Sequence, residues 1–205
     1  MDLKEFKSLI DLFFYQAGKQ NPQSAFLEWL NPKNKKKFTW GETSSNIYKL
    51  AKTLKASIAD GDRCLLVSEN RPEWLISDIA IMLANGITVP AYTTYTEKDY
   101  KYLIEDCQPS VIIVSNDEMH DKLKNIIDEK SFIRKVITFE KIQKINYKNK
   151  YLHFNSITEN NLQENDKIKN SSIKRNSPAC IIYTSGTGGN PKGVILSHGG
   201  ILNNL

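Results

Sequence analysis

The stretch Tyr183–Gly200, with the sequence YTSGTGGNPKGVILSHGG, holds the residue types best suited to chemistry in this chain. Its glycines let backbone N–H groups approach a ligand without obstruction by a Cβ atom, and its hydroxyls add neutral donors. Several neutral donors and one mobile lysine together suit a polyphosphate. The candidate groups are the hydroxyls of Thr184, Ser185 and Thr187, the glycines Gly186, Gly188, Gly189 and Gly193, and Lys192.

Better-known loops do not fit this stretch. The Walker A pattern G-x-x-x-x-G-K-[ST] fails because Lys192 precedes Gly193, and the dinucleotide pattern G-x-G-x-x-G fails because its last position falls on Pro191. A nucleophile elbow, G-x-S-x-G, would need a glycine where Tyr183 stands. A flexible glycine turn would explain the glycines and the proline, but not the hydroxyls and the lysine.

The stretch closely resembles the phosphate-binding signature of the adenylate-forming enzymes, Y-T-S-G-T-T-G-x-P-K-G-V-x-x-S-H. Within Tyr183–His198 the only departure is Gly188, which replaces a threonine. Three further segments resemble this family in order and spacing, and the last two are most similar to bacterial long-chain acyl-CoA synthetases. They are FTWGE at Phe38–Glu42, GDRCLLVSENRPEW at Gly61–Trp74 and ANGITVPAYTT at Ala84–Thr94.

The resemblance implies a two-step ligase. ATP and a fatty acid give an acyl-adenylate and pyrophosphate, and coenzyme A then takes the acyl group. Because the first step brings two anions together, it requires Mg²⁺ and donors that hold the β- and γ-phosphates. Gly188 would keep a backbone donor while lacking one hydroxyl. The residues that the resemblance assigns to ATP are Thr184, Ser185, Gly186, Thr187, Gly188, Gly189 and Lys192.

Two other functions stay open from the sequence. One is an adenylate-forming ligase for a different carboxylic acid, such as an aryl or amino acid. The other is a nucleotide-binding module without catalysis.

The later parts of the family pattern do not follow in this sequence. The Mg²⁺-binding Glu, the ribose-binding Asp and the small C-terminal domain with the catalytic Lys would lie beyond Leu205, so no catalytic residue is assigned. We therefore expect residues 1–205 to be a partial AMP-binding domain of a longer ligase, inactive by itself. A genuinely truncated protein is the alternative, and it would leave Ile201, Leu202 and Leu205 without packing partners.

Four other residues have two interpretations each. His198 either points toward the phosphate or acyl site, or simply begins a helix after Ser197. Trp74, Tyr92 and Tyr95 either line an acyl tunnel or, as we favour, take part in core or surface packing.

The elements that must position the loop alternate along the chain. Short apolar runs predict strands, and stripes of helical spacing between them predict helices, one of which begins at Pro72. This alternation is typical of a layered α/β domain with a largely parallel sheet. The predicted strands are Cys64–Ser68, Ile87–Tyr92, Val111–Ser115, Lys135–Phe139, Ala179–Thr184 and Val194–Ser197.

The flanking segments are less regular. A first helix is predicted from Phe6 to about Gly18, and the T-x-x-E pattern Thr39–Glu42 predicts a capping box for a helix that ends at Gly61. Short strands are expected at Ser24–Leu30 and Phe38–Trp40. Residues 142–177 are polar, and we expect a surface excursion with one short strand near Tyr151.

Composition and residue spacing argue against a nucleic-acid-binding, metal-binding or membrane-spanning protein. The net charge is +5, but the basic run Lys33–Lys37 has no interleaved aromatic residues, so we expect a solvated turn and no nucleic-acid partner. Cys64, Cys107 and Cys180 lack metal-ligand spacing, which predicts buried thiols and no metal held by the protein. Without a long apolar run or a signal peptide we expect a cytoplasmic protein, and peripheral membrane contact and oligomeric state stay open.

Overall fold

The computed structural model describes residues 2–30, 35–168, 172–184 and 191–205. One sheet has the strand order β7-β6-β5-β3-β4-β8-β9, and β1 and β2 form a separate antiparallel hairpin. Neighbours in the large sheet are parallel except β8 and β9, which are antiparallel. The structure therefore confirms an α/β domain with a largely parallel sheet.

The elements have the following bounds. The strands are β1 Ala25–Trp29, β2 Lys36–Thr39, β3 Arg63–Val67, β4 Ile87–Ala91, β5 Val111–Val114, β6 Lys135–Thr138, β7 Tyr151–His153, β8 Pro178–Thr184 and β9 Lys192–Ser197. The α-helices are α1 Leu9–Lys19, α2 Trp40–Lys55, α3 Pro72–Leu83, α4 Glu97–Cys107, α5 Asp117–Asp121, α6 Lys124–Glu129, α7 Phe154–Thr158 and α8 His198–Leu202. Two 3₁₀ turns lie at η1 Leu3–Glu5 and η2 Glu164–Asp166.

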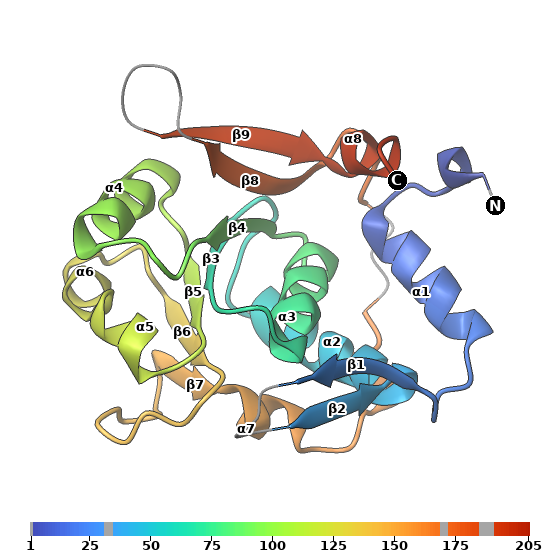
Figure 1. Ribbon diagram of the computed structural model, residues 1–205, viewed down its shortest axis with the longest axis horizontal. Coiled ribbons are helices and arrows are strands. Elements are labelled where there is room, and N and C mark those ends of the chain that lie inside the picture. Colours follow the sequence, from blue (N-terminus) through green and yellow to red (C-terminus); the bar gives the residue numbers. More distant parts are fainter. Residues whose placement is uncertain (1, 31–34, 169–171, 185–190) are drawn as a thin grey trace.

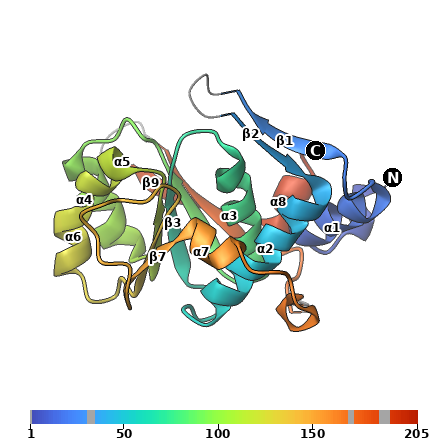
Figure 2. The ribbon, with the colours of Figure 1, turned by 90° about the horizontal axis from the view of Figure 1, so that it is seen from below.

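The helices form a layer on each face of the sheet. Helices α1, α2 and α3 lie on one side, and α4, α5 and α6 lie on the other (Figures 1 and 2). Successive residues of a strand point to opposite faces, so Cys64 and Leu66 enter one core while Leu65 and Val67 enter the other. All four are fully buried, which explains why β3 is a continuous apolar run.

Local signals set the helix starts. Thr39 and Glu42 form the expected capping box at the start of α2, and Pro72 occupies the first turn of α3. Some boundaries differ from the prediction: α1 begins at Leu9 and not at Phe6, β9 begins at Lys192 and not at Val194, and α2 ends at Lys55 and not at Gly61. Ile58 lies beyond the helix yet is buried, and Gly61 serves a later turn with a φ of 83°.

The described parts of residues 142–177 contribute a strand and a core side chain to the fold. The expected strand is present as β7, which extends the sheet by pairing parallel to β6. Phe154 is 2% exposed and packs edge-on against Phe139 in the core. The polar composition conceals this because the few buried side chains have no regular spacing.

The last residues are also better packed than the sequence predicts. Leu202 is 1% exposed and Ile201 packs against one core, which corrects the expectation that both lack partners. Helix α8, which carries both residues, contacts the N-terminal helix α1 (Figure 1). Leu205 does remain 72% exposed.

Candidate phosphate-binding site

The candidate loop joins the two strands of the β8–β9 hairpin. Thr184 is the last residue of β8, Lys192 is the first residue of β9, and the two are opposite each other in the antiparallel register. Side chains directly opposite in such a pair lie on the same face of the sheet. The predicted hydroxyl and ammonium groups are therefore neighbours at the loop end of the hairpin.

The loop end of the hairpin lies at the carboxyl ends of the parallel strands, where ligands usually bind. Strand β8 runs parallel to β4, so its carboxyl end lies with the carboxyl ends of the other parallel strands. Open α/β sheets bind ligands outside these ends. Both Thr184 and Lys192 are exposed there, and among the described residues Lys192 has no ion-pair partner.

Five predicted binding residues cannot be placed. Ser185, Gly186, Thr187, Gly188 and Gly189 lie outside the described residues. Thr184 and Lys192 remain as the two described members of the predicted set.

Gly193 has a structural role that the sequence did not reveal. A Cβ atom at this position would lie 3.2 Å from Cζ of Tyr183 and 2.9 Å from Cγ2 of Ile181. The glycine therefore makes room for the Tyr183 ring, which lies opposite it across the hairpin. The packing of Tyr183 accounts for this glycine without a ligand.

His198 faces the N-terminal helix. It begins α8, is 1% exposed, and its Nδ1 accepts a hydrogen bond of 3.3 Å from the backbone N–H of Leu9. Burial lowers the pKa of His198 to about 4, although the Asp11 carboxylate opposes the shift. Of its two interpretations, the contacts support the helix start.

The aromatic residues considered for an acyl tunnel are placed differently. Trp74 packs against one core, and Tyr95 packs against the other beside Tyr100. Tyr92 is 66% exposed and meets Tyr95 edge to face. The packing interpretation therefore fits Trp74 and Tyr95.

Elsewhere at the carboxyl edge, an ion cluster occupies the space beside the sheet. Arg71 donates to Glu73 and to Glu140, at 2.9 Å in each case, and Lys36 also pairs with Glu73. The Arg71 guanidinium lies 4.4 Å from the ring centroid of Trp29. Burial alone would raise the pKa of Glu73, but hydrogen bonds from Arg71 and Lys36 lower it.

Two residues of the basic run are thus explained by ion pairs. Lys36 belongs to the Arg71 cluster, and Lys37 lies 3.7 Å from Glu28 of β1. The three cysteines are free; Cys64 and Cys107 are buried as predicted, whereas Cys180 is half-buried. In the described parts of the chain, no group of three or more His, Cys, Asp or Glu side chains is arranged to hold a metal ion.

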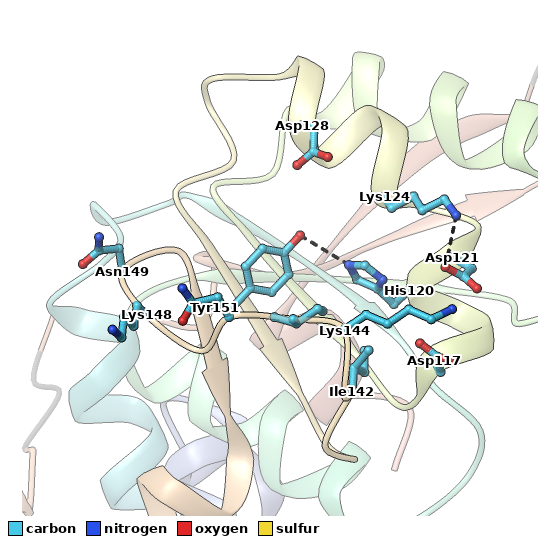
Figure 3. Close-up of a pocket in the computed structure, with 12 residues that line it drawn as sticks. Asp117, His120, Asp121, Lys124, Asp128, Ile142, Lys144, Lys148, Asn149 and Tyr151 are labelled. Atoms are coloured by element: carbon cyan, nitrogen blue, oxygen red, sulfur yellow. Dashed lines mark hydrogen bonds and ion pairs between the residues drawn. The ribbon is translucent and has the colours of Figure 1, made fainter.

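A hollow of about 560 Å³ lies beside β7, which is the outermost strand on the side of the sheet away from β9. Tyr151 points its hydroxyl at His120, at 3.3 Å from Nε2, and acidic and basic side chains surround the pair (Figure 3). Burial raises the pKa of Tyr151 to about 12 and lowers the pKa of His120. Four strands separate β7 from β8, so this hollow is separate from the candidate loop.

The protein-family model described as AMP-binding enzyme matches residues 13–205. The chain therefore belongs to the AMP-binding enzyme family. It is 32% identical over 181 residues to the long-chain-fatty-acid–CoA ligase ACSBG2 of Mus musculus, covering 84% of this chain and 27% of that protein. It is 31% identical over 134 residues to ACSBG2 of Xenopus laevis, covering 64% of this chain and 18% of that protein.

Solved structures agree on the fold. The anthranilate CoA ligase AuaEII, in complex with anthranoyl-AMP, superposes with a TM-score of 0.81 at 20% identity, covering 97% of this chain and 36% of that one. The chain thus spans about a fifth to a quarter of the length of the curated relatives named above. No helix in the described ranges has both the length and the apolar character needed to span a membrane.

Proposed function

We propose that the complete gene product is an AMP-forming acyl-CoA synthetase. It activates a long-chain fatty acid with ATP, releases pyrophosphate and transfers the acyl group to coenzyme A. The two curated relatives, both long-chain-fatty-acid–CoA ligases, support the choice of acid and thiol. Family membership of residues 13–205 supports the adenylate chemistry.

The observation that carries the proposal is the loop end of the β8–β9 hairpin. An exposed hydroxyl and an exposed ammonium group are opposite each other at the carboxyl edge of the sheet, where a polyphosphate needs neutral donors and one cation. We assign Lys192 to the β- and γ-phosphates, where its charge offsets the charge that builds on the leaving pyrophosphate. The other proposed phosphate-binding residues are Thr184, Ser185, Gly186, Thr187, Gly188 and Gly189.

Mg²⁺ would be bound with ATP in this proposal and would supply further charge neutralisation on the phosphates. The donor set at the hairpin fits such a complex, because Thr184 and Lys192 offer a neutral group and a cation to phosphate oxygens.

Product analysis of the purified gene product tests the reaction. Acyl-CoA should appear only when ATP, Mg²⁺, coenzyme A and a long-chain fatty acid are all present, with AMP formed in equal amount. Formation of ADP in place of AMP would contradict the proposal, because adenylate formation releases pyrophosphate.

A second candidate substrate class is an aryl acid. This is the acid class of the anthranilate CoA ligase AuaEII, whose fold superposes on this chain at 20% identity. A panel of fatty, aryl and amino acids under the same conditions separates the two. We expect the highest kcat/KM with a long-chain fatty acid.

A further inference from the structure

Two hydrogen bonds connect helix α4 to the loop end of the β8–β9 hairpin. The Tyr102 hydroxyl donates to the backbone carbonyl of Pro191 at 2.9 Å. The Tyr183 hydroxyl donates to Oδ2 of Asp106 at 2.5 Å. Tyr183 and Pro191 lie on the two sides of residues 185–190, so one helix contacts both chain ends that lead into the candidate loop.

The spacing of the two helix residues matches the spacing of the two strands. Tyr102 and Asp106 are four residues apart, so they project from one face of α4, separated by about one turn of roughly 5.4 Å. Neighbouring strands of a sheet lie about 4.8 Å apart. One turn of α4 can therefore reach β8 and the start of β9 at the same time.

The donor end on β8 is held firmly. Tyr183 is 6% exposed, and its ring packs over Gly193, where a Cβ atom would lie 3.2 Å from Cζ. This packing aims the hydroxyl at α4. A hydrogen bond to a carboxylate is stronger than one between neutral groups, so the bond from Tyr183 to Asp106 is the stronger of the two contacts.

Packing between α4 and the loop end of the hairpin leaves a cavity. A cavity of about 90 Å³ separates them, with Tyr102, Leu103, Tyr183 and Pro191 in its lining. A cavity removes van der Waals contacts between the surfaces on either side of it. The two hydrogen bonds therefore connect the helix to the strand ends beside this cavity, where van der Waals contacts are missing.

We propose that Tyr102 and Asp106 are positioning residues for Thr184 and Lys192, acting through Tyr183 and Pro191 to set the affinity for ATP. The inference rests on the proposed function for its link to ATP, and on the two hydrogen bonds for the positioning itself. Neither residue is given a contact with the nucleotide. Both act by fixing the end of β8 and the start of β9.

Hydrogen exchange tests the positioning without any need for activity. Backbone amides at the described strand ends, residues 182–184 and 192–194, should exchange about two- to tenfold faster in Tyr102→Phe and Asp106→Ala than in the unmodified chain, the range expected for loss of one hydrogen bond. Asp106→Asn keeps an oxygen acceptor and should restore much of the protection. Tyr151→Phe removes a comparable hydroxyl contact at the opposite edge and should leave these amides unchanged. Unchanged exchange in both Tyr102→Phe and Asp106→Ala would overturn the proposal.

Steady-state kinetics of the complete gene product test the link to ATP. The KM for ATP should rise about two- to tenfold in Tyr102→Phe and Asp106→Ala, while the KM for the fatty acid stays within about twofold. A purely structural loss would change both constants or would also appear in Tyr151→Phe, and either result contradicts positioning. If the unmodified protein shows no acid-dependent turnover, the proposed function fails, and hydrogen exchange still decides the role of α4.

Discussion

Lys192 is the described residue on which the proposed chemistry depends most. It is exposed at the start of β9, and its ammonium group has no ion-pair partner in the described ranges. Replacing Lys192 by Ala should lower kcat/KM for ATP by roughly 10- to 100-fold, because a charge-assisted hydrogen bond to phosphate is lost. Steady-state kinetics with ATP as the varied substrate give this ratio.

The matched control for this substitution is Lys124→Ala. Lys124 is also exposed, but it pairs with Asp121 beside the hollow near β7. Its removal should leave kcat/KM for ATP within about twofold. Equal losses in the two variants would show that the effect comes from general lysine removal and not from the loop.

His198 makes the stability of the chain depend on pH. Burial holds its pKa at about 4, whereas an unfolded histidine titrates near 6.5, so the unfolded chain binds more protons between these values. Stability is therefore lost as the pH falls from about 6.5 toward 4. Urea unfolding should show that this loss is smaller in His198→Asn by about 2 kcal/mol at pH 4.5.

Asn at position 198 can still accept from the Leu9 N–H, so the variant isolates titration from the loss of the hydrogen bond. His120 and His153 also have pKa values lowered by burial, and both remain in the two proteins. The same acid-induced loss in His198→Asn as in the unmodified chain would contradict this account.

At the scale of elements, the Arg71 cluster connects three parts of the fold. Arg71 precedes α3, Glu140 follows β6, and Lys36 begins β2. Arg71→Ala would leave Glu73, which is 1% exposed, without its main partner, and should cost about 3–5 kcal/mol in the free energy of unfolding. Denaturant titration of the purified chain measures the loss.

Arg134 provides the matched control for Arg71. It pairs with Asp62, but its side chain is 49% exposed. Removal of this surface partner should cost less than about 1 kcal/mol. A similar cost for Arg71→Ala would mean that the buried cluster contributes no more than an exposed ion pair.

The segment 142–177 offers a second test at this scale. Phe154 begins α7, which contacts α2, and its side chain lies in the core. Phe154→Ala should lower the free energy of unfolding by about 3–5 kcal/mol. In the same segment, Lys167→Ala should change it by less than about 0.5 kcal/mol, because Lys167 is an exposed residue paired with Glu164. Equally small changes in the free energy of unfolding for the two variants would mean that Phe154 behaves as a surface residue.

The sequence predicted the alternating core well because each buried strand is a short apolar run between turn residues. The run Val111–Val114 and the proline at the start of α3 are examples. It missed the role of Phe154, since a few irregularly spaced apolar residues in a polar segment carry no periodic signal. It also missed the contact of α8 with α1, which lies at the other end of the chain.

In the candidate site, too, the sequence predicted some features and missed others. Its donor groups are contiguous in sequence, so residue types and spacing alone pointed to a phosphate. The contacts from Tyr102 and Asp106 arise between residues 77 to 89 positions apart, and no local pattern marks them. The role of Gly193 likewise became visible only with the Tyr183 ring opposite it.

At the scale of the whole molecule, the two edges of the sheet have different surroundings. The β7 edge adjoins a hollow with mixed charges, and the other edge carries the β8–β9 hairpin, whose β9 strand leaves Val194, Ile195 and Leu196 partly exposed. Of the two, the hairpin edge combines the family signature with a cation and a hydroxyl at the carboxyl ends of the strands. The proposed activity is therefore assigned to that edge.

The most direct measurement is ATP–pyrophosphate exchange by the complete gene product, because exchange reports adenylate formation before coenzyme A is needed. Labelled pyrophosphate should enter ATP when Mg²⁺ and a long-chain fatty acid are present, and the rate should fall to background when the acid is left out. Absence of exchange with every carboxylic acid of the panel, while nucleotide still binds, would contradict the ligase and favour a binding module.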